Sequence, residues 1–461
     1  MQEQYRELSE LVSPQNFTTD SDTLATYSHD WTKNFDTRAS CVVFPQSSEE
    51  VAKVVTWARK HGFALVPSGG RTGLSGGACA LNGEVVVSLE KMNRFLDFNP
   101  VDRTVTCQAG VVTETLQKHV REKGYYFPVD FAARGSSHIG GNIATNAGGI
   151  KVLRYGNMRD WVTGLKVVTG AGDILNLNKS LVKNNTGFDL RHLMIGSEGA
   201  LGFITEATLK FTTPTKPVTV LCLGVKGLES VMSVYREFRD HVPLTAFEYF
   251  SDIALNQVIA HTGLQKPFPE PAEHYLIVEV ENVDSEAEEK TLQLFEKCME
   301  KGWLVDGAVA SSEAQARDFW RLREDISEAT AKDSPYKNDI SVTISKVPEF
   351  LRETDAVFKK YYPDFKVVWF GHVGDGNMHI NILKPKALAR EEFLRRCHEV
   401  DDILFAVIEK MGGSVSAEHG VGLVKKPYLR YTRSPAEILL MKGIKKTFDP
   451  DGILNPGKIF D

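Results

Sequence analysis

Apolar residues recur along this chain with two different spacings, which predict helices and strands in alternation. Residues 51–58 carry valines and an alanine at helical spacing, and Ser47 three residues before Glu50 is typical of a capped helix start. Gly62 is a typical helix stop. The pattern therefore predicts a helix that begins after Ser47 and ends before Gly62.

Similar patterns continue over most of the chain. Expected strands are Phe63–Pro67, Glu84–Leu89, Thr104–Gln108, Ile204–Phe211, Val218–Val225 and Tyr275–Val280, and expected helices are Thr113–Lys123, Leu228–Arg239 and Glu286–Lys301. Two prolines within residues 214–217 indicate a domain boundary. The later pattern favours an α+β domain on an antiparallel sheet. We expect domains at 1–215 and 216–420, followed by a C-terminal segment, 421–461.

Three segments, 68–77, 135–149 and 195–204, are rich in glycine and other small residues. We expect residues 135–149 to contribute nothing to a hydrophobic core. Each segment alone is typical of a tight turn, which is the alternative interpretation. Together they predict backbone that approaches a large or phosphate-bearing ligand closely. The chain lacks Gly-x-Gly-x-x-Gly, so a Rossmann site is not supported. Residues 452–458 imitate a P-loop, but Ile459 replaces the required Ser or Thr.

Composition narrows the class of protein. The chain has 461 residues, 42% apolar and 25% charged residues and a net charge of −6, so nucleic acid is not the expected partner. Six scattered cysteines without Cys-x-x-Cys exclude a recognised iron–sulfur spacing and predict buried thiols. No apolar run is long enough for a membrane span, and the first ten residues resemble no targeting signal. We expect a soluble, cytoplasmic protein.

Residues 366–383 predict a β-hairpin with Gly374–Asn377 as its loop. In that register His372 lies directly opposite His379, close enough for both imidazoles to bind one cation. Asn381 lies two residues beyond His379 and therefore points to the same face.

A third metal ligand is suggested by Glu418, which lies in a small-residue loop. Two histidines and one carboxylate suit Zn²⁺, with Mn²⁺ or Fe²⁺ as alternatives, and leave coordination positions open. The other interpretation is an ordinary hydrogen-bonded histidine pair without a metal.

Four motifs identify the chain as similar to a known family. PSGGRTGLSGGA (67–78), GSSHIGGNIATNAGG (135–149), RYGNMRDWVTGLKVV (154–168) and IGSEGALGFITEATL (195–209) resemble the FAD-binding domain of p-cresol methylhydroxylase and vanillyl-alcohol oxidase. GHVGDGNMHIN and SAEHGVG resemble the metal-site motifs of the FAD-linked D-2-hydroxy acid dehydrogenases. That branch includes D-2-hydroxyglutarate dehydrogenase, D-lactate dehydrogenase and the glycolate oxidase flavin subunit. The resemblance covers nearly the whole chain and implies an α+β fold: this FAD domain, an antiparallel cap domain and a tail returning to the flavin.

The resemblance implies a set of FAD-binding residues. They are Pro67, Ser68, Gly69, Gly70, Arg71, Thr72, Gly73 and Ser75 around the pyrophosphate, Gly140, Gly141, Asn142, Thr145 and Ala147 along the flavin, Glu198, Gly202 and Ile204 near the adenosine, and Asn455 and Lys458 over the isoalloxazine. Some relatives attach FAD covalently through a histidine in the first loop. Residues 68–77 contain neither His nor Cys, so non-covalent FAD is expected.

The resemblance also implies the chemistry. A D-2-hydroxy acid would lose its hydroxyl proton and send a hydride to the flavin, with a cation bound by His372, His379 and Glu418 activating the hydroxyl. His419 is the expected general base. Because neighbouring residues of extended chain point opposite ways, these roles for Glu418 and His419 require a turn there.

The expected substrate residues are Arg323, Ser327, Lys337 and Asn381, by resemblance to the D-2-hydroxyglutarate enzymes. For Arg323 the alternative is an ion pair with a neighbouring acid on the helix surface. Two cations favour a dicarboxylate, so D-2-hydroxyglutarate is the predicted substrate. D-lactate or glycolate oxidation, a subunit of a larger oxidase and a flavin-free metallohydrolase are the alternatives. The electron acceptor is expected to be a quinone or an electron-transfer flavoprotein, and a homodimer is a candidate assembly.

Overall fold

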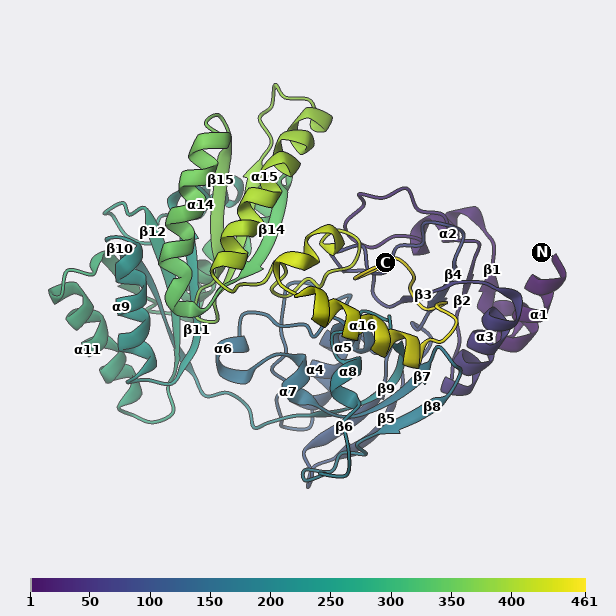
Figure 1. Ribbon diagram of the computed structural model, residues 1–461. Helices are drawn as coiled ribbons and strands as arrows, with labels where there is room; N and C mark the ends of the chain where they lie inside the picture. Colours follow the sequence, from purple (N-terminus) through teal and green to yellow (C-terminus); the bar gives the residue numbers. More distant parts are fainter. Residues whose placement is uncertain (1) are drawn as a thin grey trace. The chain divides into compact units, whose positions relative to one another are not determined.

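The computed structural model describes residues 2–461, and Figure 1 shows its helices and strands along the chain. The helices are α1 (Gln2–Val12), α2 (Ser21–Tyr27), α3 (Ser48–His61), α4 (Thr113–Arg121), α5 (Ile139–Ala144), α6 (Val152–Tyr155), α7 (Met158–Trp161), α8 (Arg191–Met194), α9 (Leu228–Arg239), α10 (Asp252–Thr262), α11 (Ala287–Glu300), α12 (Glu313–Glu324), α13 (Ile326–Ala331), α14 (Val347–Tyr361), α15 (Arg390–Lys410) and α16 (Pro435–Phe448). The strands are β1 (Phe17–Thr18), β2 (Cys41–Val43), β3 (Leu65–Ser68), β4 (Val85–Ser88), β5 (Phe95–Asn99), β6 (Thr104–Gln108), β7 (Val162–Thr169), β8 (Ile174–Leu177), β9 (Gly202–Lys210), β10 (Val218–Val225), β11 (Leu244–Ser251), β12 (His274–Glu281), β13 (Leu304–Val309), β14 (Tyr336–Ser341), β15 (Lys366–His372) and β16 (Asn377–Leu383).

The chain divides into two compact units. The first unit comprises residues 1–148, 156–214 and 418–461, and the second comprises 149–155 and 215–417. The boundaries expected from the sequence lie within three residues of the divisions after 214 and 417. The short segment 149–155, which contains α6, packs with the second unit although it interrupts the first in sequence.

The first unit contains a small mixed sheet in the order β1-β2-β4-β3. The helix predicted after Ser47, which is α3, packs against this sheet. Ser47 accepts a hydrogen bond from the Glu50 amide at 3.1 Å, and Gly62 ends α3 with φ +71°. Valines of α3 pack on β2, β3 and β4 in one buried core. The predicted helix and both of its ends are confirmed.

A five-stranded antiparallel sheet, in the order β5-β6-β9-β7-β8, forms the other part of the first unit. Its core includes Ile139 and Ile143 from α5, both fully buried. The expectation that residues 135–149 contribute nothing to a core was therefore wrong at these two positions. Ile139 and Ile143 are four residues apart, so they lie on one face of α5, and this face packs into the core.

The C-terminal tail joins the small sheet of the first unit. Leu454 lies beside Leu65 of β3 in a parallel bridge, and the Asn455 amide donates to the Leu65 carbonyl oxygen at 2.7 Å. Residues far apart in sequence are thereby held at the strand that leads into the first glycine-rich loop.

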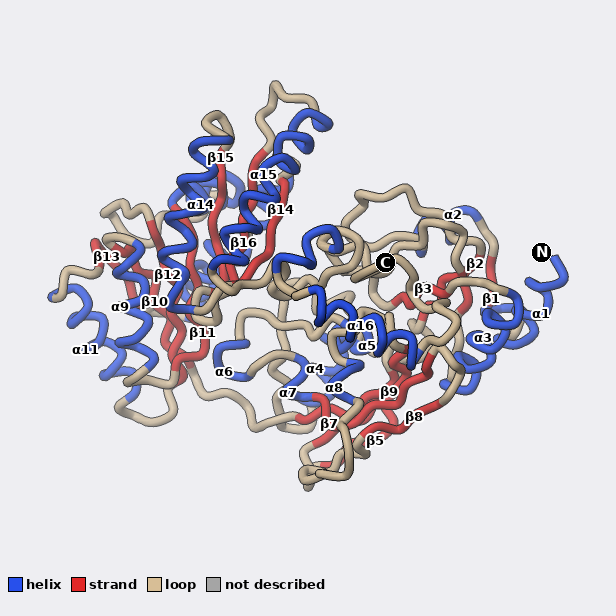
Figure 2. The backbone as a smooth tube through the Cα atoms, in the orientation of Figure 1, coloured by secondary structure: helices blue, strands red, loops and turns tan. Residues whose placement is uncertain are grey.

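The second unit is built on a seven-stranded antiparallel sheet, drawn in red in Figure 2, in the order β13-β10-β12-β11-β15-β16-β14. Helices α10, α12 and α13 pack on one face through apolar side chains. Helices α9, α11 and α15 contact the sheet from the other side, and α14 does so through ring contacts of Phe350 and Phe358 with Trp369 of β15. The predicted α+β fold on an antiparallel sheet is confirmed.

All six cysteines are free thiols in the structure, and all are buried, as the sequence predicted. Burial raises the pKa of the Cys107 thiol to about 12, so this thiol stays protonated at neutral pH. Among the described helices, none has the length and apolar content required to cross a membrane.

Candidate functional site

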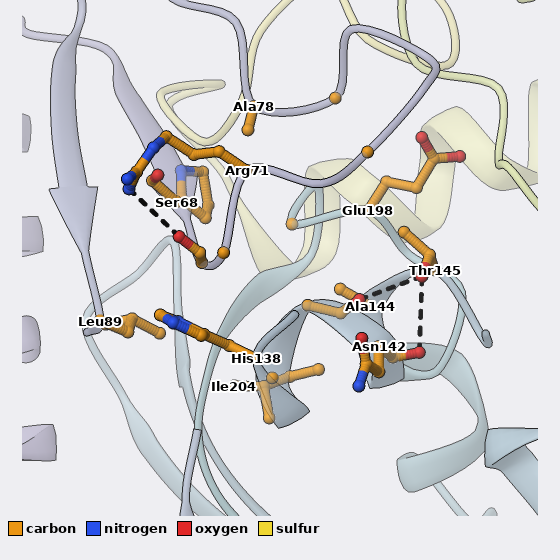
Figure 3. A pocket seen from close by; sticks show the side chains of 18 of the residues that line it. Ser68, Arg71, Ala78, Leu89, His138, Asn142, Ala144, Thr145, Glu198 and Ile204 are labelled. Atoms are coloured by element: carbon orange, nitrogen blue, oxygen red, sulfur yellow. Dashed lines mark hydrogen bonds between the residues drawn. The ribbon is translucent and has the colours of Figure 1, made fainter. Parts of the chain in front are cut away.

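A pocket in the first unit is lined by the three glycine-rich segments that the sequence singled out (Figure 3). Its lining residues are Asp30, Pro67, Ser68, Gly69, Gly70, Arg71, Thr72, Gly73, Ser75, Gly77, Ala78, Leu89, Ala109, His138, Gly140, Gly141, Asn142, Ala144, Thr145, Glu198, Gly199, Gly202, Phe203 and Ile204. Small residues and backbone make up most of this wall. The pocket is therefore shaped for a ligand that is contacted by main-chain groups.

Two glycines of the pocket explain why side chains are missing there. A Cβ on Gly70 would clash with the carbonyl oxygen of Ser136, so the first and second glycine segments meet backbone to backbone. Gly141 differs, because a Cβ there would meet no atom of the protein within 4 Å. Packing within the protein therefore requires glycine at Gly70, whereas at Gly141 the protein leaves open space in the lining of the pocket.

Three polar atoms of the pocket residues fit a polar cofactor. Asp30 Oδ2, Ser68 Oγ and His138 Nδ1 are buried, and none has a hydrogen-bond partner among the described residues. Buried polar groups are rarely left without a partner, so a ligand with donors and acceptors is expected here. Burial also lowers the pKa of His138, which keeps this imidazole neutral at pH 7. The pocket residues thus fit FAD, which carries ribityl hydroxyls, phosphates and two ring systems.

Glu198 links the pocket to the loop that follows Glu418. Its carboxylate accepts hydrogen bonds from the Val421 and Gly422 amides, each at 2.8 Å. Burial raises the pKa of Glu198 to about 7, although these two hydrogen bonds lower it. Asn455 donates from Nδ2 to the carbonyl oxygens of Gly77 and Glu198, at 2.9 and 2.8 Å. Glu198 and Asn455 therefore join three distant stretches of the chain.

In the second unit, one face of the sheet gathers the predicted histidines, but in a different register from the one expected. His372 lies opposite Asn377, and His379 lies opposite Phe370. The predicted direct pairing of His372 with His379, and the loop at Gly374–Asn377, were wrong, because the turn occupies residues 373–376. A shift of two residues keeps every side chain on its face, so both imidazoles still lie together, with ring centroids 5.3 Å apart.

A buried carboxylate lies behind each histidine. Glu248 Oε1 lies 2.8 Å from His372 Nδ1, and Asp339 Oδ1 lies 3.4 Å from His379 Nδ1. A carboxylate at Nδ1 fixes the ring and makes Nε2 the nitrogen available for a metal. Burial raises the pKa of Glu248, but His372 and Arg323 together outweigh this effect, and the pKa lies below its usual value. The chemistry of this donor set fits a divalent cation.

Arg323, on α12, contacts Glu248, the same carboxylate that contacts His372. Its Nη2 is 2.9 Å from Glu248 Oε2, and its guanidinium lies 5.0 Å from the centre of the Phe370 ring. The side chain is buried, so the expected alternative of a surface pair with a helix neighbour was wrong: the partner is a buried carboxylate on β11. Arg323 Nε and Nη2 make no hydrogen bond with other described residues.

The strand register also places two other predicted substrate residues on this face. Lys337 of β14 lies opposite Asn381 of β16, two residue pairs along from Asp339 and His379, and therefore on the same face. Asn381 is buried and donates to the Thr330 hydroxyl at 3.2 Å. Ser327 lies on α13, one turn before Thr330, and is exposed.

Glu418 directly follows Ala417, the last residue of the second unit. One ligand atom from each of His372, His379 and Glu418 lies within 4.8 Å of the others. The chain bends at residues 417–419, and Gly420 has φ +81°. The turn that roles for both Glu418 and His419 require is therefore present.

Comparison with known proteins gives the family. Residues 39–178 match the FAD binding domain model, and residues 214–459 match the model of FAD linked oxidases, C-terminal domain. The D-2-hydroxyglutarate dehydrogenase of Stutzerimonas stutzeri is 54% identical over 98% of this chain and 98% of its own. The chain belongs to the FAD-linked oxidase family. Mitochondrial D-2-hydroxyglutarate dehydrogenase of Rattus norvegicus is 36% identical over 97% of this chain and 83% of its own.

Solved structures of other proteins share the fold of this chain. The 4-ethylphenol oxidase of Gulosibacter chungangensis has a TM-score of 0.76 at 18% identity, covering 100% of this chain and 97% of its own. p-Cresol methylhydroxylase has a TM-score of 0.75 at 15% identity, with coverage of 100% and 97%. The predicted p-cresol methylhydroxylase type of FAD-binding domain and the FAD-dependent dehydrogenase class are confirmed.

In this member of the family, most of the residues predicted to bind FAD line one pocket. Ala147, Asn455 and Lys458 are the predicted residues outside the described pocket lining. Lys458 is buried, and its burial lowers its pKa. Asn455 instead supports the pocket from behind through Gly77 and Glu198.

Sequence reasoning missed several polar residues of both regions. They are Asp30 and His138 in the pocket, and Glu248, Thr330 and Asp339 around the histidines. A usable signal existed for Asp339, because Lys337 and Asp339 alternate on a strand and therefore share a face. Glu248 is the one charged residue of the strand sequence LTAFEYFS, and a charge in such a run was the available signal.

Proposed function

We propose that this protein oxidises D-2-hydroxyglutarate to 2-oxoglutarate, using non-covalent FAD and a divalent metal ion. The observation that carries the proposal is one sheet face on which His372 and His379 each contact a buried carboxylate. Arg323 and Lys337 lie at the same face. The dehydrogenases named for D-2-hydroxyglutarate at 54% and 53% identity support the same substrate.

His372, His379 and Glu418 are the proposed metal ligands. Zn²⁺ is the proposed ion, with Mn²⁺ or Fe²⁺ as alternatives, since two imidazoles and one carboxylate suit all three. When bound, the cation would polarise the hydroxyl and the neighbouring carboxylate of the substrate. Metal analysis of the purified protein should find about one ion per chain. If a chelator removes all metal from the protein and the protein still oxidises its substrate, the assignment of a catalytic metal site is wrong.

Arg323 and Lys337 are the proposed partners of the distal carboxylate, and Asn381 and Ser327 are proposed to help orient the substrate. The planar guanidinium of Arg323 can bind a carboxylate through two N–H groups. Lys337 adds a second positive charge from the neighbouring strand. A monocarboxylate such as D-lactate has no second carboxylate for these two cations to bind, so the clamp favours a dicarboxylate.

His419 is the proposed general base. A neutral imidazole has a free nitrogen lone pair, so His419 can accept the hydroxyl proton of the substrate. FAD, when bound, supplies the acceptor for the hydride that leaves C2. His419→Gln should slow flavin reduction by about 100-fold or more while substrate binding is retained. A variant that reduces its flavin at the normal rate would exclude this role.

The proposed FAD site includes Pro67, Ser68, Gly69, Gly70, Arg71, Thr72, Gly73, Ser75, Gly140, Gly141, Asn142, Thr145, Ala147, Glu198, Gly202, Ile204, Asn455 and Lys458. Acid precipitation should release all of the flavin into the supernatant, since residues 68–77 hold no His or Cys for a covalent link. Flavin that stays with the precipitate would contradict non-covalent binding.

Electrons are proposed to leave the reduced flavin to a quinone or an electron-transfer flavoprotein, and the protein is proposed to work in the cytoplasm, as a homodimer. Plant and animal relatives are named as mitochondrial, so the location needs its own test. Cell fractionation, light scattering of the purified protein and assays with each acceptor test these three points separately.

The decisive test is anaerobic reduction of the bound flavin. Purified protein loaded with FAD and Zn²⁺ is mixed with D-2-hydroxyglutarate, L-2-hydroxyglutarate, D-lactate and glycolate, and flavin absorbance is followed. Fast bleaching by D-2-hydroxyglutarate, with slower or no bleaching by the others, is expected. Flavin that stays oxidised with every D-2-hydroxy acid would overturn the proposed function, and faster bleaching by D-lactate or glycolate would overturn the substrate.

A further inference from the structure

The strongest unassigned feature of the second unit is the position of Glu248. Its side chain is 1% exposed, in the middle of β11. Its two oxygens face two different partners: Oε1 lies 2.8 Å from His372 Nδ1, and Oε2 lies 2.9 Å from Arg323 Nη2. One buried carboxylate therefore contacts both a proposed metal ligand and a proposed substrate-binding arginine.

The contact with His372 bears on metal binding. A carboxylate that accepts the Nδ1 proton leaves the Nε2 lone pair for a cation and holds the ring in place. The corresponding contact of His379 with Asp339 is longer, 3.4 Å, and Asp339 also accepts a hydrogen bond from Asn377 at 2.8 Å. Of these two carboxylates, Glu248 therefore makes the closer contact with a histidine.

The contact with Arg323 bears on substrate binding. Arg323 and Glu248 are both buried, and an arginine without a nearby carboxylate would be costly at such a site. The 2.9 Å approach nevertheless does not align as a hydrogen bond, and Arg323 Nε and Nη2 make none with other described residues. Glu248 thus balances the charge of the guanidinium without consuming these N–H groups, which can then serve a substrate carboxylate.

We propose that Glu248 is a positioning residue that orients His372 for the metal and Arg323 for the distal carboxylate of the substrate at the same time. Metal binding and selectivity for a dicarboxylate are then coupled through one side chain. This inference rests on the proposed function, because it takes His372 as a metal ligand and Arg323 as part of the clamp.

Glu279 offers a matched control on the same sheet face. It is a buried glutamate on the adjacent strand β12, and it bonds to Lys151, Trp320 and Thr245 rather than to a proposed ligand or clamp residue. Substitution of Glu279 also removes a buried charge, so the two variants separate a general effect of lost charge from the specific role of Glu248.

The first experiment measures metal retention. Glu248→Gln, Glu248→Asp, Glu279→Gln and the unmodified protein are loaded with Zn²⁺ and titrated with a chromogenic chelator, with flavin content and thermal unfolding as checks of folding. Glu248→Gln should lose Zn²⁺ at about tenfold or more lower chelator concentration, with Glu248→Asp in between and Glu279→Gln unchanged. Equal retention by Glu248→Gln and the unmodified protein would overturn the proposal. If Glu248→Gln fails the folding checks, Glu248→Asp carries the test.

The second experiment measures substrate selectivity at saturating Zn²⁺. Glu248→Gln should raise the KM for D-2-hydroxyglutarate about tenfold more than the KM for D-lactate, because Arg323 is no longer held. Arg323→Met should show the same loss of selectivity but keep its Zn²⁺ affinity. Equal KM changes for both substrates in Glu248→Gln would overturn the coupling.

Failure of this inference is distinguishable from failure of the proposed function. The chelator titration needs no turnover, so it reports on Glu248 and His372 even in protein that oxidises no hydroxy acid. Suppose that D-2-hydroxyglutarate bleaches the flavin of the unmodified protein, but Glu248→Gln has the same Zn²⁺ retention and the same KM values. Then only the inference about Glu248 is wrong. If the unmodified protein does not bleach, the proposed function falls independently.

Discussion

The glycine-lined pocket and the sheet face that carries His372 and His379 (the histidine face) differ in the groups they offer to a ligand. The pocket offers mainly backbone, and the histidine face offers polar side chains. Around the pocket, small residues leave the backbone uncovered for the proposed FAD, and the first two glycine-rich segments meet backbone to backbone. On the histidine face, long polar side chains from β11, β14, β15 and β16 converge on one side of a sheet. A site built from backbone can be predicted from glycine-rich segments of the sequence. A site built from side chains of several strands can be predicted only when the pairing of those strands is known.

Removing a metal ligand from the histidine face should have the largest effect. His379→Ala should slow flavin reduction by D-2-hydroxyglutarate about 1000-fold, because a bound cation supplies several kcal/mol of transition-state stabilisation. FAD content should not change, since the pocket belongs to the other unit. Anaerobic stopped-flow absorbance and metal analysis measure both quantities.

His261→Ala is the control for this variant, because His261 is an exposed histidine on α10 of the same unit. It should reduce its flavin at the normal rate. If His379→Ala loses FAD as well as metal, the pocket and the histidine face do not bind their ligands independently.

Adding one methyl group to the flavin pocket should have the next largest effect. Gly141→Ala places a Cβ where no protein atom lies within 4 Å, so the FAD-free protein should be at least as stable as before. FAD affinity should fall about 10- to 100-fold, because the methyl group would overlap a closely packed cofactor. Fluorescence titration with FAD and thermal unfolding of the FAD-free protein measure the two effects.

Gly443→Ala, on α16, is the matched control, since its Cβ also meets nothing within 4 Å and it lies outside the pocket lining. It should bind FAD normally. Normal FAD affinity in Gly141→Ala would show that backbone at Gly141 does not approach the cofactor closely.

Lys337→Met tests whether side chains of the histidine face set selectivity. The KM for D-2-hydroxyglutarate should rise about tenfold and that for D-lactate less than about twofold, because only the dicarboxylate has a second charge to pair. Steady-state assays with both substrates provide the measurement. Lys332→Met, an exposed lysine that follows α13, serves as control and should change neither constant. Equal losses for both substrates would remove Lys337 from the clamp.

The smallest expected effect concerns Glu198, a titratable residue of the backbone-built pocket. Its pKa is raised to about 7 in the folded protein by burial, against 4.5 for an ordinary glutamate. Between these values the folded state holds a proton that the unfolded state has lost, so stability falls as pH rises. From about pH 6 to about pH 7 the free energy of unfolding of FAD-free protein should fall about 1 kcal/mol more than that of Glu198→Gln. Urea unfolding at both pH values provides the measurement, and parallel slopes would contradict the raised pKa.

Local patterns predicted much of the fold. The ends of α3, strand β6 and strand β10 follow from capping residues and apolar periods that act within a few residues. The hairpin register could not be fixed in the same way, because turns of different length satisfy the same alternation. Its error of two residues left His372 and His379 on the correct face, since side chains alternate with a period of two.

The sequence by itself determined which segments are poor in side chains and which residues could bind a cation, because glycine content and residue type are local properties. Only the tertiary structure decided that Glu248 stands between His372 and Arg323, and that Glu198 and Asn455 join the tail to the pocket. The physical reason is that these partners are far apart in sequence, and their contacts arise when strands pair and buried charges find the nearest groups that can satisfy them.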